Sequence, residues 1–231
     1  MAYEQEARDP MSDPMLPSRG TLDREERRIK DGILRMGSLV ESQIRRAMAA
    51  LVRADGRLAE EVIAGDAAIN EAQRQVSEAI LTTIATQSPV ARDLRFLLAL
   101  DHVGSELERI GDHASGVAKQ VGRIEGALPA SADLARMGEL AADQVRAVIG
   151  ALIDLDETAA RAVAERDDEI DHLYRKVFSE VIGVMQRDPE AVDRGTRAIL
   201  AAHWVERIGD RVTNVAEDIV YLASGSVEDL N

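Results

Sequence analysis

A five-residue string, Glu-Arg-Ile-Gly-Asp, occurs twice in this chain, at Glu108–Asp112 and again 98 residues later at Glu206–Asp210. Each copy lies in a long stretch where apolar residues recur every three or four positions, the spacing of a helix that buries one face. The same string in the same helical context indicates an internal duplication. The chain is therefore expected to fold as two similar helical units in tandem.

The composition favours helices over sheets. Hydrophobic residues make up 45% of the 231 residues, but aromatic residues only 3%, and good helix formers such as Ala, Leu, Glu and Arg dominate. Beyond residue 23 the only prolines are Pro89, Pro129 and Pro189, and each is expected to mark the start of a helix. The sequence therefore predicts an all-α fold.

The apolar spacing predicts six long antiparallel helices. Short turns separate them, and the order of the first half recurs in the second. We therefore predict two tandem, pseudo-symmetric three-helix bundles between a leader and a tail. The predicted segments are a disordered leader (1–23), a first bundle (24–126), a second bundle (127–225) and a tail (226–231).

Charge and residue content exclude several classes of function. The formal charge of −14 argues against binding to nucleic acids and to anionic lipid surfaces. The absence of cysteine excludes disulfides and thiolate chemistry. No apolar run is long enough for membrane insertion, and no catalytic or nucleotide-binding motif is present. A non-enzymatic, cytoplasmic protein is expected.

The duplicated string places two carboxylates on one helix face. Residues four apart lie one turn apart, so Glu108 and Asp112 form one acidic pair and Glu206 and Asp210 another. At 100° per residue both pairs are expected on the side opposite the apolar seam, facing away from the core.

The second pair is continued along the helix by Asn214 and Glu217, whereas Gly116 and Lys119 stand at these positions in the first half. An all-oxygen set suits hard cations such as iron, manganese or magnesium. A solvated helix face explains the same pattern without any ligand. The candidate metal residues are Glu108, Asp112, Glu206, Asp210, Asn214 and Glu217.

Other polar residues have simpler interpretations. His113 and His203 lie close enough to the pairs to join a metal shell, but such residues are more often plain polar positions on a helix. Glu169 and His172 form an isolated Glu-x-x-His, which is interpreted as surface. Trp204 is expected between helices.

Two segments carry runs of residues that are typical of a known family. The first is Ala85–Phe96, which reads ATQSPVARDLRF, together with LERIGDHA from Leu107. Here Arg92, Asp93 and Arg95 are interpreted as interhelix salt bridges. The second is Val205–Leu222, VERIGDRVTNVAEDIVYL. Both segments resemble the signatures of the PhoU family of phosphate-uptake regulators, and the resemblance covers about residues 24–225.

The resemblance implies a fold of two symmetric three-helix bundles and a role in signalling. A PhoU-like protein is expected to repress the phosphate-starvation response by contacting the ATPase of a phosphate ABC transporter and a sensor histidine kinase, and to form a homodimer. It also implies iron, zinc or manganese on the Glu/Asp-x-x-x-Asp faces. The sequence departs from the family at Gly116, Lys119 and Arg211, where Asn, Glu and His are frequent.

Two alternatives remain open at this stage. A metal-dependent enzyme or metal store built on carboxylate helices would use the same acidic faces, although the second Glu-x-x-His of a di-iron bundle is missing. A plain helical scaffold would leave those faces solvated.

Overall fold

The computed structural model describes residues 19–122 and 127–230, and within these ranges it contains helices and no strands. The all-α prediction is therefore confirmed. The elements are α1 (Arg19–Arg53), α2 (Gly56–Gln87), α3 (Arg92–Ala118), α4 (Ser131–Asp154), α5 (Glu157–Ala164), α6 (Asp167–Arg187), the 3-10 turn η1 (Pro189–Ala191) and α7 (Val192–Ser224).

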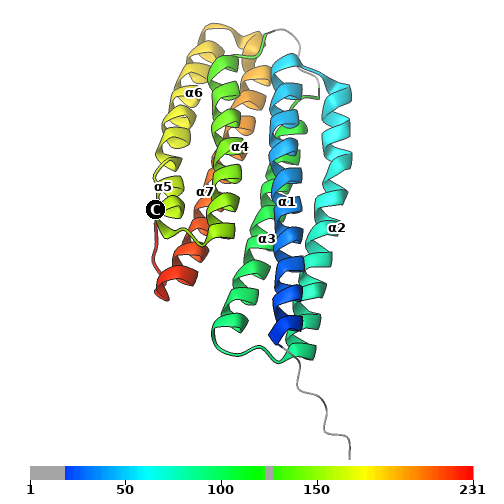
Figure 1. Ribbon diagram of the computed structural model, residues 1–231. Coiled ribbons are helices and arrows are strands. Elements are labelled where there is room, and N and C mark those ends of the chain that lie inside the picture. Colours follow the sequence, from blue (N-terminus) through cyan, green and yellow to red (C-terminus); the bar gives the residue numbers. More distant parts are fainter. Residues whose placement is uncertain (1–18, 123–126, 231) are drawn as a thin grey trace, which may run out of the picture.

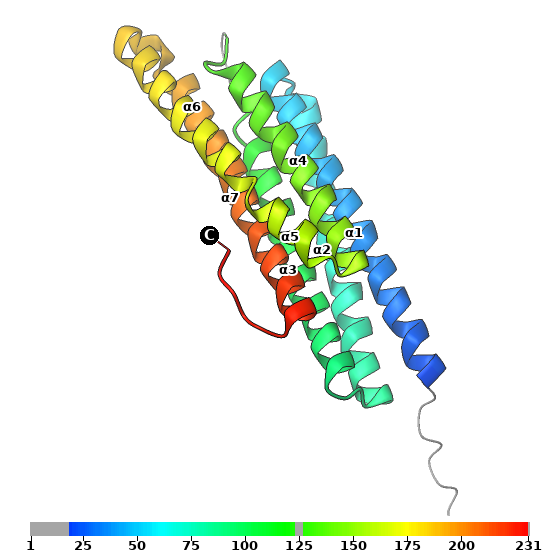
Figure 2. The same cartoon turned by 60° about the vertical axis from the view of Figure 1, so that its left-hand side comes forward.

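The helices form two groups that lie side by side along one long axis (Figures 1 and 2). In the first half α1, α2 and α3 pack against one another; in the second, α4 and α7 pack with α5 and α6. α5 and α6 follow one another along α7 and together take the place of a single helix. No helix in the described ranges has the length and apolarity needed to cross a bilayer.

The helix boundaries differ from the predicted ones at three places. α1 begins at Arg19, so the last five residues of the predicted leader are helical. The third helix ends at Ala118, whereas the first bundle was predicted to run to residue 126; residues 1–18, 123–126 and 231 lie outside the described residues. The predicted fifth helix is interrupted at Glu165 and Arg166. After α7, residues 225–230 turn back along the molecule (Figure 2).

Both halves use the same turn between their first two helices. Ala54 and Leu155, 101 residues apart, have φ values of 51° and 50°. The residue that follows each is an aspartate N-cap: Asp55 accepts from the Leu58 amide and Asp156 from the Ala159 amide, both at 3.0 Å. These caps satisfy backbone donors that would otherwise be unpaired. The duplication therefore extends to backbone conformation.

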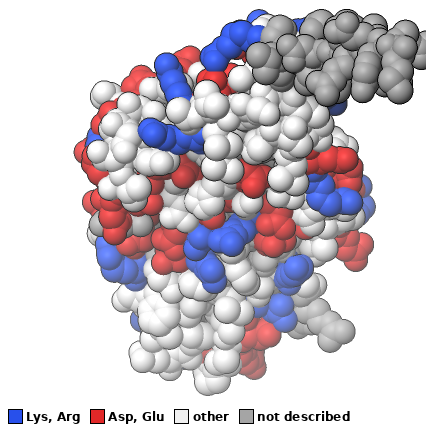
Figure 3. Space-filling model, turned by 90° about the horizontal axis from the view of Figure 1, so that it is seen from below, with Lys and Arg blue, Asp and Glu red and all other residues white. Residues whose placement is uncertain are grey.

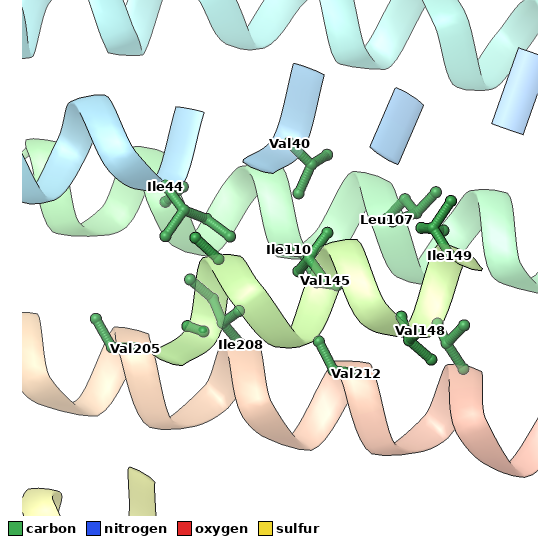
Figure 4. Packing of buried hydrophobic residues seen from close by; sticks show 14 of the residues in the cluster. Val40, Ile44, Leu107, Ile110, Val145, Val148, Ile149, Val205, Ile208 and Val212 are labelled. Atoms are coloured by element: carbon green, nitrogen blue, oxygen red, sulfur yellow. The ribbon is translucent and has the colours of Figure 1, made fainter. Parts of the chain in front are cut away.

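The two halves share one hydrophobic core. The predicted seam of α1 is buried from Ile29 to Leu51, and so is that of α3 from Phe96 to Val117. α1 packs against α4 and α3 packs against α7, so these four helices join the halves. Figure 4 shows the central layer, where Ile110 lies between side chains of the other three helices.

Candidate functional site

The acidic pair of α7 lies in the contact between α7 and α6. Glu206 and Asp210 face Asp167 and Asp171, the carboxylates of the first turns of α6. The carboxyl group of Asp167 occupies the space that a Cβ on Gly209 would need. The glycine of the repeated string thus leaves room for this carboxyl beside the α7 backbone.

These carboxylates are crowded and partly buried. Burial, together with the charges of Asp171, Asp210 and Glu206, raises the pKa of Asp167 to about 7. Burial is also the first cause of the raised pKa values of Glu206 and Asp210. Two buried oxygens, Asp167 Oδ1 and Glu206 Oε2, have no hydrogen-bond partner among the described residues. The carboxylates of this cluster therefore repel one another, and the nearby side chains of Arg175 and His203 offset that repulsion only in part.

The corresponding pair in the first half is closer to solvent. Glu108 is half-buried and Asp112 exposed, and both face Asp66 of α2. Burial, followed by neighbouring carboxylates, raises both pKa values, and Lys119 opposes the rise at Asp112. Asp66 is already satisfied, because its Oδ1 accepts from Ser115 Oγ at 3.0 Å and from Gln43 Nε2 at 3.3 Å.

The expectation that both acidic pairs face away from the core needs correction. Only 23% of the Glu206 side chain is exposed, and Asp210 is half-buried. The pair lies at the edge of the core because α6 runs alongside it. Helical-wheel arithmetic locates the seam of one helix but does not place its neighbours.

Asn214 and Glu217 do not extend the cluster. Asn214 Nδ2 donates to Glu106 Oε2 of α3 at 3.0 Å, and Glu217 Oε1 accepts from the backbone amide of Leu230 at 3.0 Å. The predicted row of four ligands on α7 is therefore divided. Its first two members face α6, and the other two are engaged by α3 and by the tail.

Sequence reasoning missed Glu106, which is 1% exposed and the most deeply buried acid among the described residues. Besides Asn214, it contacts Arg211 Nη1 at 3.4 Å and Arg109 Nη1 at 3.3 Å. It follows Val103 by three residues and precedes Ile110 by four, which places it on the apolar seam of α3. That position was the signal in the sequence that could have indicated its burial. The pairing also gives Arg211 a structural role between the halves.

The aromatic residues form a second contact between α3 and α7. Trp204 packs where Gly116 leaves space, with indole carbon Cδ2 2.7 Å from the site of a Cβ. His113 lies 5.3 Å from the Trp204 ring, and burial lowers its pKa to about 4, so it is neutral at pH 7. Trp204 therefore lies between helices as predicted. Glu169 and His172 are exposed, as predicted.

The α6–α7 cluster fits a cation by charge and donor type. Its donors are oxygens, which hard divalent ions prefer, and His203 Nδ1 lies 3.4 Å from Glu206 Oε2 as an added donor. In the described ranges no three His, Asp or Glu side chains converge as a preformed metal site requires. The fit is thus one of chemistry, without preformed geometry.

The fold and these paired faces define a class: an all-helical protein of two tandem three-helix repeats, each with a carboxylate pair on its third helix. A family model described as the PhoU domain matches residues 33–121 and 134–219. The chain belongs to the PhoU family.

Relatives match along most of their length. A "phosphate-specific transport system accessory protein PhoU homolog" of Clostridium acetobutylicum is 35% identical over 202 residues, which cover 86% of this chain and 92% of the relative. The crystal structure of the "phosphate transport system regulatory protein PhoU" from Streptococcus pneumoniae superimposes with a TM-score of 0.85 at 31% identity, covering 90% and 99% of the two chains. The crystal structure of PhoU from Pseudomonas aeruginosa superimposes with a TM-score of 0.83 at 32% identity, covering 89% of this chain and 100% of that one.

Proposed function

We propose that this chain is a non-enzymatic accessory protein of a phosphate transport system that represses phosphate uptake and the phosphate-starvation response when phosphate is plentiful. It acts by contacting the ATPase of the phosphate ABC transporter and a sensor histidine kinase. One observation carries the proposal: the family match spans both halves, and relatives named for this system match over nearly their full length. The charge of −14 suits protein partners with basic surfaces.

The regulatory role is tested by deleting the gene. Phosphate-starvation genes are expected to stay switched on in high phosphate, and the wild-type gene supplied in trans should restore repression. Normal repression in the deletion strain would contradict the role.

The contact with the transporter needs a separate test. The purified chain should bind the ATPase subunit in a pull-down that is weakened by raised salt, as expected for charge-assisted contacts. Failure of the two proteins to bind at low salt would overturn the proposed contact while leaving the regulatory role to the genetic test.

We also propose that the α6–α7 cluster holds a divalent cation, iron, zinc or manganese. Glu206 and Asp210 would bind it from α7, and Asp167 and Asp171 from α6. The unpartnered oxygens and raised pKa values support this assignment, because a cation relieves the repulsion among the four carboxylates. The pair Glu108 and Asp112 is a weaker site, since Asp66 is already hydrogen-bonded and Lys119 lies nearby.

Elemental analysis of protein purified without chelator tests this site. The double variant Glu206→Ala/Asp210→Ala should lose the bound metal, whereas Glu169→Ala, an exposed position on α6, should keep it. Wild-type protein without stoichiometric metal, or a double variant that retains it, would refute the assignment.

We further propose a cytoplasmic location and a homodimer. Exposed apolar side chains at one end of the molecule support self-association: Leu81, Val90 and Leu98 are 68%, 73% and 55% exposed. Light scattering of the purified chain should give twice the monomer mass, and Leu98→Glu should reduce it. A wild-type monomer at micromolar concentration would exclude the dimer.

A further inference from the structure

A cleft of about 270 Å³ opens at one end of the molecule, between the two halves. The first half lines it with the start of α1 and of α3. The second half contributes Leu155, from the turn after α4, and Leu222, near the end of α7. Figure 3 views the molecule from this end, where lysine and arginine side chains lie among acidic ones. The cleft is distinct from the acidic faces described above.

The cleft is locally positive in a strongly acidic protein. Four cationic side chains line it and two acidic ones, so the local balance is 4 − 2 = +2, against −14 for the whole chain. The cationic residues are Arg19, Lys30, Arg92 and Arg95, and the acidic ones are Glu26 and Asp93.

Only one of these cations is paired with an acid of the cleft. Arg19 Nη1 contacts Asp93 Oδ2 at 2.6 Å, which is the interhelix salt bridge predicted for Asp93. Arg92 and Arg95 make no ion pair with any described carboxylate. The salt bridges predicted for them are therefore absent from the described residues. Their charges remain available to a ligand.

Aromatic rings hold two of the cations in place without neutralising them. Lys30 Nζ lies 4.7 Å from the centre of the Phe96 ring, and the Arg95 guanidinium lies 5.5 Å from that of Tyr221. Such contacts favour the cation but leave its hydrogen-bond donors free. Glu26, one turn before Lys30 on α1, has one buried oxygen without a hydrogen-bond partner among the described residues.

We propose that this cleft binds a small organic phosphate. Guanidinium groups bind phosphate oxygens through paired, charge-assisted hydrogen bonds, so Arg92 and Arg95 would hold the phosphate group and Lys30 would add a third charge. A volume of about 270 Å³ exceeds what inorganic phosphate alone would fill. The apolar side chains Phe96, Leu155 and Leu222 provide a surface for the rest of the molecule.

The ligand would contact both halves at once. It would therefore stabilise their association, because anything that binds only the folded state adds to its stability. The inference stands on the cleft alone and does not depend on the regulatory role.

Calorimetric titration of the full chain with adenosine monophosphate, glucose 6-phosphate and inorganic phosphate tests the proposal. An organic phosphate is expected to bind more tightly than inorganic phosphate. Binding should weaken about tenfold or more in Arg92→Gln/Arg95→Gln, which removes both guanidinium groups. The matched control is Arg57→Gln/Arg74→Gln, two exposed arginines of α2 that pair with glutamates of their own helix.

Lys30→Met gives a second variant that keeps the packing on Phe96 and removes one charge, in case the double variant fails to fold. It should also weaken binding. No binding of any of the three probes at millimolar concentration overturns the proposal. So does equal binding by the Arg92→Gln/Arg95→Gln variant. If inorganic phosphate binds as tightly as both organic phosphates, the apolar side chains Phe96, Leu155 and Leu222 do not contact the ligand, and the proposal of an organic phosphate is wrong.

Discussion

At the scale of single residues, the repeated string owes its glycine to a close approach between helices. In the second half, the carboxyl of Asp167 occupies the position that a Cβ on Gly209 would take. In the first half, Ile69 Cδ1 lies 3.0 Å from the position that a Cβ on Gly111 would take. A mid-helix glycine costs about 1 kcal/mol relative to alanine. Glycine stands at both positions despite this cost because a side chain of a neighbouring helix packs directly on the backbone there. The neighbour is α2 for Gly111 and α6 for Gly209.

Gly209→Ala should therefore destabilise the protein. The new methyl group forces the Asp167 carboxyl to move, and the overpacking cost of about 1–3 kcal/mol exceeds or cancels the gain of about 1 kcal/mol that alanine brings to a helix. The control is Gly150→Ala on α4, where nothing lies within 4 Å of the new Cβ and a small gain is expected. Urea unfolding measures both, and equal effects of the two changes would contradict the contact.

The raised pKa of Asp167 predicts a pH dependence of stability. Its pKa is about 7 in the folded protein and near the ordinary aspartate value of 3.8 when unfolded, so the folded state binds more protons between these values. The contribution is fully present below about pH 4 and is lost as pH rises through 7. In the presence of a chelator, the melting temperature of Asp167→Asn should fall less than that of wild type between pH 5 and 8. Parallel curves would show that Asp167 does not carry the effect.

At the scale of elements, the periodic seams of α1 and α3 could be read from the sequence because each is a local pattern of apolar residues. The interruption between α5 and α6 could not, since no proline or glycine marks Glu165 and Arg166. The acidic pairs were also found from spacing. Asp167, which lies beside the pair Glu206 and Asp210, could not be found in this way, because its position depends on how α6 packs on α7.

The matching N-caps provide a test of the duplication. Asp55→Ala and Asp156→Ala each remove one side-chain acceptor from a backbone amide at 3.0 Å, which should cost about 1 kcal/mol in each case. Because the two turns lie far apart along the long axis (Figure 1), the double variant should show the sum. Chemical denaturation of the three variants gives these values, and strongly unequal costs would mean that the two turns are not equivalent.

At the scale of the whole molecule, the halves are joined both by apolar packing and by a buried charge. Ile149 of α4 packs on Gly37 of α1, with Cγ1 2.9 Å from the site of a Cβ. Glu106 of α3 binds Asn214 of α7 in the other joint. A surface shared along four helices favours unfolding of both halves in one step.

Ile149→Ala tests this coupling. The side chain is 5% exposed, and truncating a buried isoleucine costs about 2–5 kcal/mol. Circular dichroism reports all helices, whereas the fluorescence of Trp204, the single tryptophan, reports the α3–α7 contact. If the halves unfold together, the two probes give coincident urea transitions in wild type and shift equally in the variant, although Ile149 lies at the α1–α4 joint. A dichroism transition with a second step that Trp204 does not detect would show that each half unfolds alone. A ligand bound between the halves would then have to couple their unfolding before it could stabilise the whole molecule.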